Sequence, residues 1–186
     1  PMGLAGLVSL DGSLGPRAMD YYVERARGGV GLIITGLFKV ENEIDPFQGV
    51  FSRMSRQALA PFVELAEAVH SLGARIFVQL TAGFGRVAAA ARLQGHTPVS
   101  ASAVPYYWNP KQNCRELKTE EVEQLVKAFG PAAEILAAAG IDGIDGKLRE
   151  AWAKELPALE ARLDLVLRDV PVAEAVAAGA RAAGLR

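Results

Sequence analysis

The feature that most constrains the fold of this chain is a threefold alternation of a helical segment with a short, buried strand. The first predicted helix, "RAMDYYVERARGG", carries four apolar residues on one face: Met19, Tyr22, Val23 and Ala26. The run "VGLIITG" that follows is apolar at nearly every position, which is typical of a strand covered on both faces. Because a helix separates each strand from the next, the pattern predicts a parallel sheet with helices outside it.

The second and third units repeat this order. The helix "QALAPFVELAEAVHSLGA" precedes the strand "RIFVQL"; it is predicted to stop at Gly73 and to bury Phe62, Leu65, Ala66 and Val69. The helix "KTEEVEQLVKAFGPAAEILAAAG" is predicted to have Thr119 as its N-cap and a kink at Pro131, and the short strand "IDGID" follows it. An open doubly wound sheet and a closed (β/α)8 barrel both satisfy this order.

In both architectures, ligands gather at the carboxyl ends of the parallel strands. Gly36 ends the strand "GLIIT" and Gln79 ends "RIFVQ", so both are predicted to lie at one rim. The Gln79 amide offers a donor and an acceptor on one planar head, which suits a ligand edge that carries both. Three small residues follow it, Ala82, Gly83 and Gly85, and would let backbone approach a flat ring. Alternatively, Gln79 bonds neighbouring backbone within its own sheet.

Composition limits the class of partner. With 51% hydrophobic and 22% charged residues among 186, the chain resembles an ordinary globular domain. Its formal charge of -1, with acidic and basic residues intermixed, gives no electrostatic reason to expect nucleic acid or a membrane surface as partner. The single cysteine, Cys114, cannot form an intramolecular disulfide. We expect a cytoplasmic protein that binds small molecules or proteins, and the abrupt start "PMGLAGLVSLDG" suggests a truncated N-terminus.

Several separated segments resemble those of one enzyme family. In order, they are "PMG", "DYYVERARGGVGLIITG", "LAEAVHSLGARIFVQLTAGFGR", "PVSASAVP", "CRELKTEEVEQLVKAF" and "AAGIDGI". Together they resemble the old yellow enzyme family of FMN-dependent NAD(P)H:flavin oxidoreductases, in the branch with 2,4-dienoyl-CoA and 2-enoate reductases. The resemblance covers about residues 1–144 and implies an α/β fold of the (β/α)8 TIM-barrel type, with FMN over the carboxyl ends of the strands. It also implies NAD(P)H as reductant and an activated alkene as small-molecule substrate.

The same resemblance assigns residues to the FMN site. Pro1 and Met2 match the end of the first barrel strand, whose backbone lies against the flavin. Gly3 matches a position that is often Thr or Cys and tunes the flavin, which glycine cannot do. Gly36, or the leucine after it, matches the rim of the second strand near the isoalloxazine, and Gln79 matches the glutamine that binds the flavin's pyrimidine edge. No catalytic residue and no metal ligand is assigned.

Residues in the long predicted loop 81–117 each allow two roles. Arg86 could neutralise a carboxylate or phosphate of a substrate, or be a solvated surface arginine. The aromatic triplet at 106–108 could wall a substrate channel or pack the loop onto the barrel. Neither histidine is assigned any chemistry, and Cys114 is expected to be structural because no histidine partner is recognisable.

The chain departs from the family after the last predicted strand. Relatives continue with a His-x-x-His or His-x-x-Asn pair that polarises the substrate carbonyl and a tyrosine that supplies a proton, whereas this sequence reads "GIDGIDGKLREAW". Residues 147–186 do not resemble the family and are predicted to form two or three helices, although "LDLVL" could be a strand. A complete barrel needs roughly 250 residues. We therefore expect about half an FMN-binding barrel over residues 1–146, followed by a helical tail.

Two functions stay open at this point. The first is an FMN-dependent oxidoreductase module of the ene-reductase type, which in complete relatives passes hydride from NAD(P)H via flavin N5 to an activated alkene. The alternative is a noncatalytic half-barrel fragment that acts as an assembly or interaction unit. The exposed edge of half a barrel predicts that the tail covers it or that the chain forms a homo-oligomer. Because the carbonyl donors of the family are missing, the chain as written is expected to be a poor ene-reductase.

Overall fold

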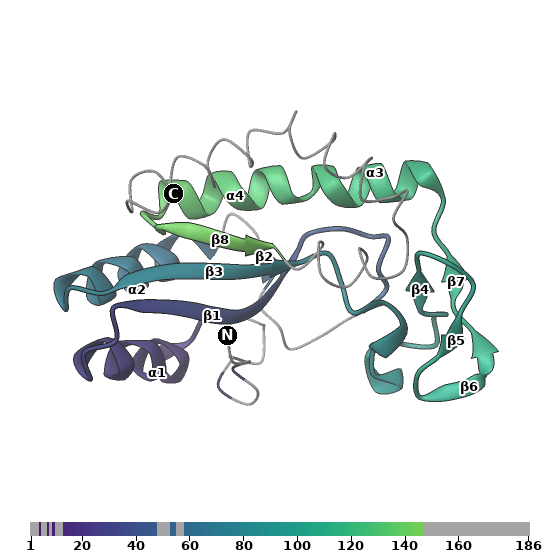
Figure 1. Cartoon of the computed structure of the whole chain (residues 1–186), viewed down its shortest axis with the longest axis horizontal. Coiled ribbons are helices and arrows are strands. Elements are labelled where there is room, and N and C mark those ends of the chain that lie inside the picture. The colour runs from purple at the N-terminus through teal and green to yellow at the C-terminus, as the bar shows by residue number, and fades with distance from the viewer. Residues whose placement is uncertain are drawn as a thin grey trace.

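The computed structural model describes residues 13–47, 53–54 and 58–146, together with Leu4, Leu7 and Ser9. Within these residues, four parallel strands form one sheet in the order β2-β1-β3-β8: β1 (Leu32–Val40), β2 (Arg53–Met54), β3 (Arg75–Thr81) and β8 (Gly143–Gly146). Figure 1 shows β1, β3 and β8 side by side, with their carboxyl ends towards the same side of the molecule. The parallel sheet predicted from the alternating pattern is confirmed.

Helices pack on one face of this sheet. They are α1 (Pro16–Arg27), α2 (Leu59–Ser71), α3 (Thr119–Lys127) and α4 (Phe129–Ala138). Helix α1 contacts β1, and α2 contacts β3, α1 and α4, so the helices form a continuous layer. Alternate residues of β3, namely Ile76, Val78 and Leu80, are fully buried in the core between this layer and the sheet. The opposite face of β3 carries Phe77 and Gln79.

The burial pattern of the first two helices agrees with the sequence. Helix α2 buries the four predicted residues, Phe62, Leu65, Ala66 and Val69. The chain then leaves the helix through Gly73, whose φ of 78° lies in the left-handed region that favours glycine. Helix α1 begins at Pro16, whose missing N–H costs nothing in the first turn, and buries Tyr22 and Ala26 as predicted. Met19 and Val23 are half-buried, and Ala18 completes the inner face instead.

The third predicted helix is divided into α3 and α4 at Ala128. Pro131 lies in the first turn of α4, where its missing N–H has no intrahelical partner to lose, so the predicted kink appears as a break just before it. The prediction of Thr119 as N-cap is wrong by one residue, because Lys118 holds that position. The backbone N–H of Lys118 donates to Glu121 Oε2 at 2.8 Å, which secures this helix start.

The first strand does not end at Gly36, so this prediction is wrong: β1 continues to Val40. Its pairing with β3 is irregular between Ile34 and Leu37, and Leu37 lies opposite Gln79. Over this step β1 holds one residue more than β3, which is the definition of a β-bulge. Gly36 is therefore a bulge residue within the strand rather than its last residue.

This bulge changes which side chains of β1 face the helices. Before it, Ile33 and Thr35 are buried; after it, Phe38 and Val40 are fully buried. The alternation thus shifts by one residue, as expected when a residue is inserted in a strand. The ring of Phe38 meets that of Phe62 in α2 at 5.1 Å, which confirms its direction. As a result, Leu37 points to the same face of the sheet as Gln79.

The long predicted loop contains structure of its own beyond the carboxyl ends of β1 and β3 (Figure 1). It forms two small sheets, from β4 (Val99–Ser100) with β7 (Arg115–Glu116), and from β5 (Pro105–Tyr106) with β6 (Asn109–Asn113). Two 3-10 turns, Gly85–Val87 and Ala90–Arg92, precede them. A second hydrophobic cluster of Phe47, Ala88, Leu93, Tyr106 and Cys114 holds this region together.

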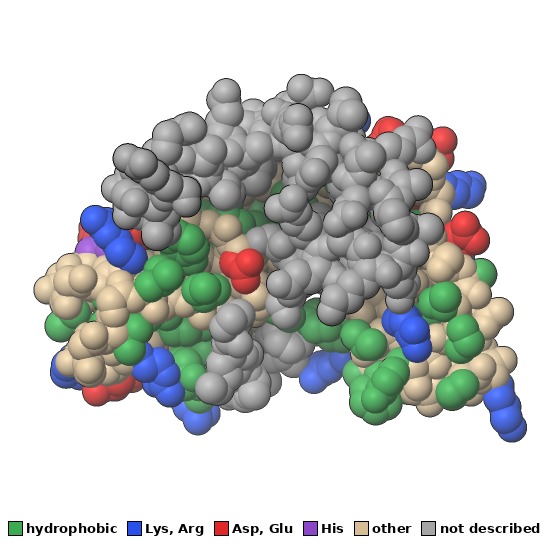
Figure 2. Space-filling model, viewed as in Figure 1, with side chains coloured by type: hydrophobic (Ala, Val, Ile, Leu, Met, Phe, Trp, Pro, Cys, Tyr) green, Lys and Arg blue, Asp and Glu red, His purple; other side chains and the backbone are tan. Residues whose placement is uncertain are grey.

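Some predictions lie outside the described residues. These are the flavin contacts of Pro1, Met2 and Gly3 and the whole tail 147–186. In the part of the chain that is described, no helix is both long and apolar enough to cross a membrane. Figure 2 shows basic side chains at several separate places on the viewed face, interspersed with acidic ones.

Candidate functional site

Three residues on neighbouring strands lie in one row near the carboxyl ends of the sheet. Leu37 of β1 pairs with Gln79 of β3, which pairs with Asp145 of β8. Gln79 is 3% exposed, and its Nε2 donates a hydrogen bond to Asp145 Oδ2 at 2.6 Å. Gln79 lies close to the end of its strand without ending it, because β3 continues to Thr81. The sequence left open that the Gln79 amide bonds neighbouring backbone within its own sheet. The structure shows that its NH2 group instead bonds a side chain of the next strand.

Two hydroxyl groups hold the bulge beside this row. Thr35 Oγ1 donates to the carbonyl of Gly36 at 2.9 Å and accepts the backbone N–H of Gln79 at 3.2 Å. The N–H of Gly36 donates to the hydroxyl of Tyr22 at 2.9 Å. Burial raises the pKa of Tyr22 to about 12, so this hydroxyl keeps its proton near neutral pH. Side chains therefore satisfy two peptide N–H groups where the ladder is irregular, and they fix Gly36 next to Gln79.

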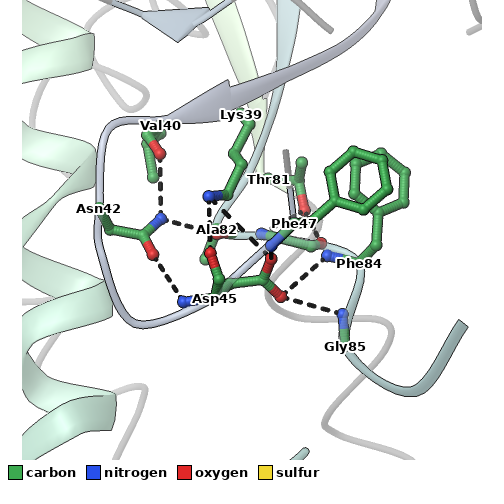
Figure 3. A network of polar contacts seen from close by, with 10 residues as sticks. Lys39, Val40, Asn42, Asp45, Phe47, Thr81, Ala82, Phe84 and Gly85 are labelled. Carbon is green, nitrogen blue, oxygen red and sulfur yellow. Dashed lines mark hydrogen bonds and ion pairs between the residues drawn. The ribbon is translucent and has the colours of Figure 1, made fainter. Parts of the chain in front are cut away.

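The loop after β1 is tied to the loop after β3 by a polar network (Figure 3). Asn42 Nδ2 donates to the carbonyls of Val40 and Ala82 at 3.0 and 2.7 Å, and its Oδ1 accepts the N–H of Asp45 at 3.0 Å. Lys39 Nζ donates to the carbonyl of Asp45 at 2.9 Å and lies 4.0 Å from its Oδ1. The Asn42 side chain thus links the two loops that follow β1 and β3, which we call the rim loops. Lys39 fixes the first of these loops.

The Asp45 carboxylate binds three backbone N–H groups. Its Oδ1 accepts from Phe47 at 3.0 Å, and its Oδ2 accepts from Phe84 and Gly85 at 3.2 Å each (Figure 3). A Cβ placed on Gly83 would lie 2.0 Å from Asp45 Cγ. The sequence predicted that the small residues here make room for a flat ring. At Gly83 this space is taken by the Asp45 side chain, so the glycine is required by the network.

Arg86 lies in the turn Gly85–Val87, directly after the rim loop. Its side chain is half-buried, and its Nε is buried without a hydrogen-bond partner among the described residues. This position excludes the freely solvated surface arginine that was one of its two predicted roles. Since Nε is buried, an anion would have to bind through the terminal nitrogens of the guanidinium.

The aromatic triplet 106–108 clamps the same turn. The Tyr106 hydroxyl, the Tyr107 N–H and the Trp108 indole N–H donate to the carbonyls of residues 88, 86 and 87, at 2.7, 3.0 and 3.0 Å. Tyr106 is buried, whereas Tyr107 and Trp108 are 55% and 60% exposed, and their rings meet edge to face at 4.8 Å. Hydrophobic side chains are visible on the surface at this end of the molecule (Figure 2). These bonds pack the hairpin onto the turn, so they join two parts of the loop 81–117 to each other.

The cysteine and the histidines are placed as structural residues. Cys114 is buried, and burial raises the pKa of its thiol, which makes it a poor nucleophile. His70 Nε2 lies 2.7 Å from Asp142 Oδ2, at the opposite end of the strands from the Gln79 row. His96 is exposed.

The structure brings together the two described residues that were predicted to bind the cofactor, Gly36 and Gln79. Arg86 follows them at the rim. Sequence reasoning missed Asp145, although a signal existed: "RIFVQ" and "IDGID" are successive parallel strands, and aligning their last residues pairs Gln79 with Asp145. It also missed the Asp45 network, because two of the three backbone partners of Asp45 lie 39 and 40 residues further along the chain.

Comparison with known proteins identifies relatives of this chain. The model of the NADH:flavin oxidoreductase / NADH oxidase family matches residues 5–146. Cinnamate reductase of Clostridium sporogenes is 45% identical over 151 residues, covering 78% of this chain and 22% of that protein. NADH oxidase of Thermoanaerobacter brockii is 40% identical over 148 residues, with the same two coverages of 78% and 22%. The chain thus spans about a fifth of the length of these curated relatives.

A solved structure agrees with the family match. The old yellow enzyme homologue from Zymomonas mobilis superposes with a TM-score of 0.62 at 25% identity, covering 76% of this chain and 41% of that one. This similarity confirms the predicted partial barrel and the resemblance to old yellow enzymes. The cofactors of that family, FMN and NAD(P)H, are those expected from the sequence. The chain belongs to the NADH:flavin oxidoreductase / NADH oxidase family.

Proposed function

We propose that this chain is the FMN-binding part of an oxidoreductase that transfers hydride from NAD(P)H to an activated alkene. The observation that carries the proposal is the position of Gln79, a buried amide in the row formed with Leu37 and Asp145 at the carboxyl ends of the strands. This is the end at which enzymes with parallel strands bind their ligands. The donor set fits a flavin, because one planar amide matches the alternating N–H and C=O groups of the pyrimidine edge.

Each rim residue has a defined part in this proposal. A bound flavin supplies the hydride chemistry through its N5. Gln79 binds the pyrimidine edge, and Gly36, Pro1, Met2 and Gly3 line the ring. The bulge at Gly36 supports this, because the Thr35 hydroxyl bonds both the Gly36 carbonyl and the Gln79 N–H and so holds the glycine backbone beside Gln79.

Arg86 is proposed to bind the anionic group of the substrate. The turn that carries it, Gly85–Val87, directly follows the rim loop. Cinnamate, in the name of one relative, is an unsaturated carboxylate, and a guanidinium binds carboxylates in a bidentate manner. We extend this substrate class, an alkene conjugated to a carboxylate, to the present chain.

Flavin binding by the purified chain tests the proposal. Titration with FMN, followed by flavin fluorescence, should give saturable binding, and Gln79→Leu should weaken it about 5- to 150-fold, because a buried ligand edge loses its partner at a cost of about 1–3 kcal/mol. Gln124→Leu is the matched control, since Gln124 is exposed on α3 and should leave the affinity unchanged. Equal affinities for FMN in wild type and Gln79→Leu would contradict the assignment of Gln79.

The same titration separates this proposal from a noncatalytic assembly unit. Such a unit would bind no FMN and would appear as a stable oligomer in light scattering. Saturable FMN binding would exclude the noncatalytic unit, whether the chain is a monomer or an oligomer.

A further inference from the structure

The hydrogen bond between Gln79 and Asp145 has a fixed direction. An ionised carboxylate accepts hydrogen bonds and cannot donate them, so the group that faces Asp145 at 2.6 Å is the amide NH2 of Gln79. Turning the amide over would place two acceptor oxygens at this distance, which is strongly unfavourable in a site where Gln79 is 3% exposed. The carbonyl Oε1 of Gln79 is thereby directed away from Asp145.

The surrounding contacts keep both side chains in this arrangement. The two residues are partners in the register of β3 with β8, so their side chains leave the same face of the sheet. The backbone N–H of Gln79 is bonded to Thr35 Oγ1 at 3.2 Å, and Thr35 itself is fully buried. Rotation of the Gln79 side chain away from Asp145 would break a charge-assisted bond, which is worth about twice a neutral one.

We infer that Asp145 is a positioning residue that sets the orientation of the Gln79 amide, so that the site presents one N–H and one C=O to its ligand in a fixed order. Asp145 takes one of the two NH2 hydrogens and leaves the other, together with Oε1, for the ligand. Oε1 then accepts from the N3–H of a flavin, and the remaining N–H donates to a neighbouring carbonyl of the pyrimidine ring. This inference rests on the proposed function and adds to it the residue that selects the ligand edge.

Variants of Asp145 in the full chain test the inference through FMN affinity. Asp145→Ala should weaken FMN binding about three- to tenfold, because the amide is then free to adopt the unproductive orientation. Asp145→Asn should retain most of the affinity, since its carbonyl oxygen still accepts from the Gln79 NH2. Asp20→Ala, on the exposed face of α1, is the control and should leave the affinity unchanged.

A double-mutant cycle distinguishes positioning from general support of the fold. In the Gln79→Leu background, Asp145→Ala should have no further effect on FMN binding, because there is no amide left to orient. With 3-deaza-FMN, in which a C–H replaces N3–H, Asp145→Ala should have a smaller effect than with FMN, because only the bond from the Gln79 N–H to the ring carbonyl then depends on the amide orientation. Equal losses in both backgrounds, or no loss from Asp145→Ala in the wild type, would overturn the inference while leaving FMN binding itself intact. Absence of FMN binding by the wild type would overturn both the proposed function and this inference.

Discussion

The carboxylate of Asp142 joins three elements at the amino ends of the strands. Its Oδ2 accepts the backbone N–H of Ile76 in β3 at 2.9 Å and contacts His70 Nε2 of α2 at 2.7 Å, while its Oδ1 accepts from Arg75 at 2.7 Å. Asp142 itself lies directly before β8. Because these contacts hold two strands and a helix together, we predict that Asp142→Ala lowers the free energy of unfolding substantially.

The magnitude follows from what each partner loses. The Ile76 residue is fully buried, and leaving its N–H without an acceptor costs about 1–3 kcal/mol. The His70 contact adds about 1 kcal/mol. The Arg75 side chain is 67% exposed, so its pair adds less than about 1 kcal/mol. The total is about 2–5 kcal/mol for Asp142→Ala. Asp142→Asn should lose less, because its amide oxygen still accepts from Ile76.

Urea unfolding monitored by circular dichroism measures this loss. We expect a lower midpoint with an unchanged slope for Asp142→Ala, and no change for the control Asp20→Ala on the exposed face of α1. If Asp142→Ala unfolds within about 0.5 kcal/mol of wild type, the junction at Asp142 does not stabilise the fold in the way the contacts indicate.

The stability from Asp142 should also depend on pH. Burial alone would raise the pKa of Asp142, but the hydrogen bonds from Ile76, His70 and Arg75 outweigh burial and lower it below its usual value. A carboxyl whose pKa is lowered by folding contributes stability above its unfolded pKa of about 3.9, and this contribution is lost as pH falls through the folded pKa. The difference in unfolding free energy between wild type and Asp142→Asn should therefore be constant above about pH 5 and shrink below pH 4. A difference that grows on acidification would refute this reasoning.

Three further predictions concern the rim and the activity. Gly83→Ala should destabilise the chain by about 1–3 kcal/mol, because the new Cβ would lie 2.0 Å from Asp45 Cγ, whereas Gly130→Ala on open helix surface should be neutral or slightly stabilising; urea unfolding compares them. Tyr22→Phe should cost about 1–3 kcal/mol in the same measurement, because it leaves a buried peptide N–H of the bulge unpaired. With added FMN and NAD(P)H, the turnover number for anaerobic reduction of a cyclic enone should stay below about 1 per second. The reason is that the sequence has no His-x-x-His or His-x-x-Asn pair to polarise the substrate carbonyl. Faster turnover would reveal another carbonyl donor.

The helices and strands of the described region were largely predictable because their signals are local. The inward face of α2 could be identified from the spacing of its four apolar residues, and all four are buried. Gly73 was predictable as a helix stop because a left-handed residue is needed there. One boundary moved at Lys118, where the glutamate of the first turn captures an N–H one residue earlier than expected, and the third helix is divided at Ala128.

The bulge was not predictable, for a physical reason. The strand β1 carries apolar residues at odd and at even positions, as strands inside parallel sheets commonly do. The hydrophobic pattern therefore does not show that, at Gly36, the residues facing the helices change from odd to even positions. The sequence predicts Gly36 as the end of the strand, whereas in the structure Gly36 is a bulge residue within it. What closes the bulge is the hydroxyl of Tyr22, 14 residues earlier in the sequence, and the apolar pattern of α1 identifies this residue only as part of the core.

The two aspartates of the third unit lie near opposite ends of the sheet, and we expect Asp142 to affect stability and Asp145 to affect ligand binding. Asp142 lies at the amino ends of the strands, where substitutions in barrels of this type mainly affect stability. Asp145 lies near the carboxyl ends, where substitutions mainly affect ligand binding. The rim around Asp145 has ties of its own: Asn42 links the two rim loops, and the buried Asp45 carboxylate binds three backbone N–H groups. Each bond to a buried carboxylate is worth about 1.5–3 kcal/mol, so the rim keeps its shape through contacts made within the described residues. For this reason, we expect this rim to keep its geometry in a chain that spans about a fifth of the length of its curated relatives.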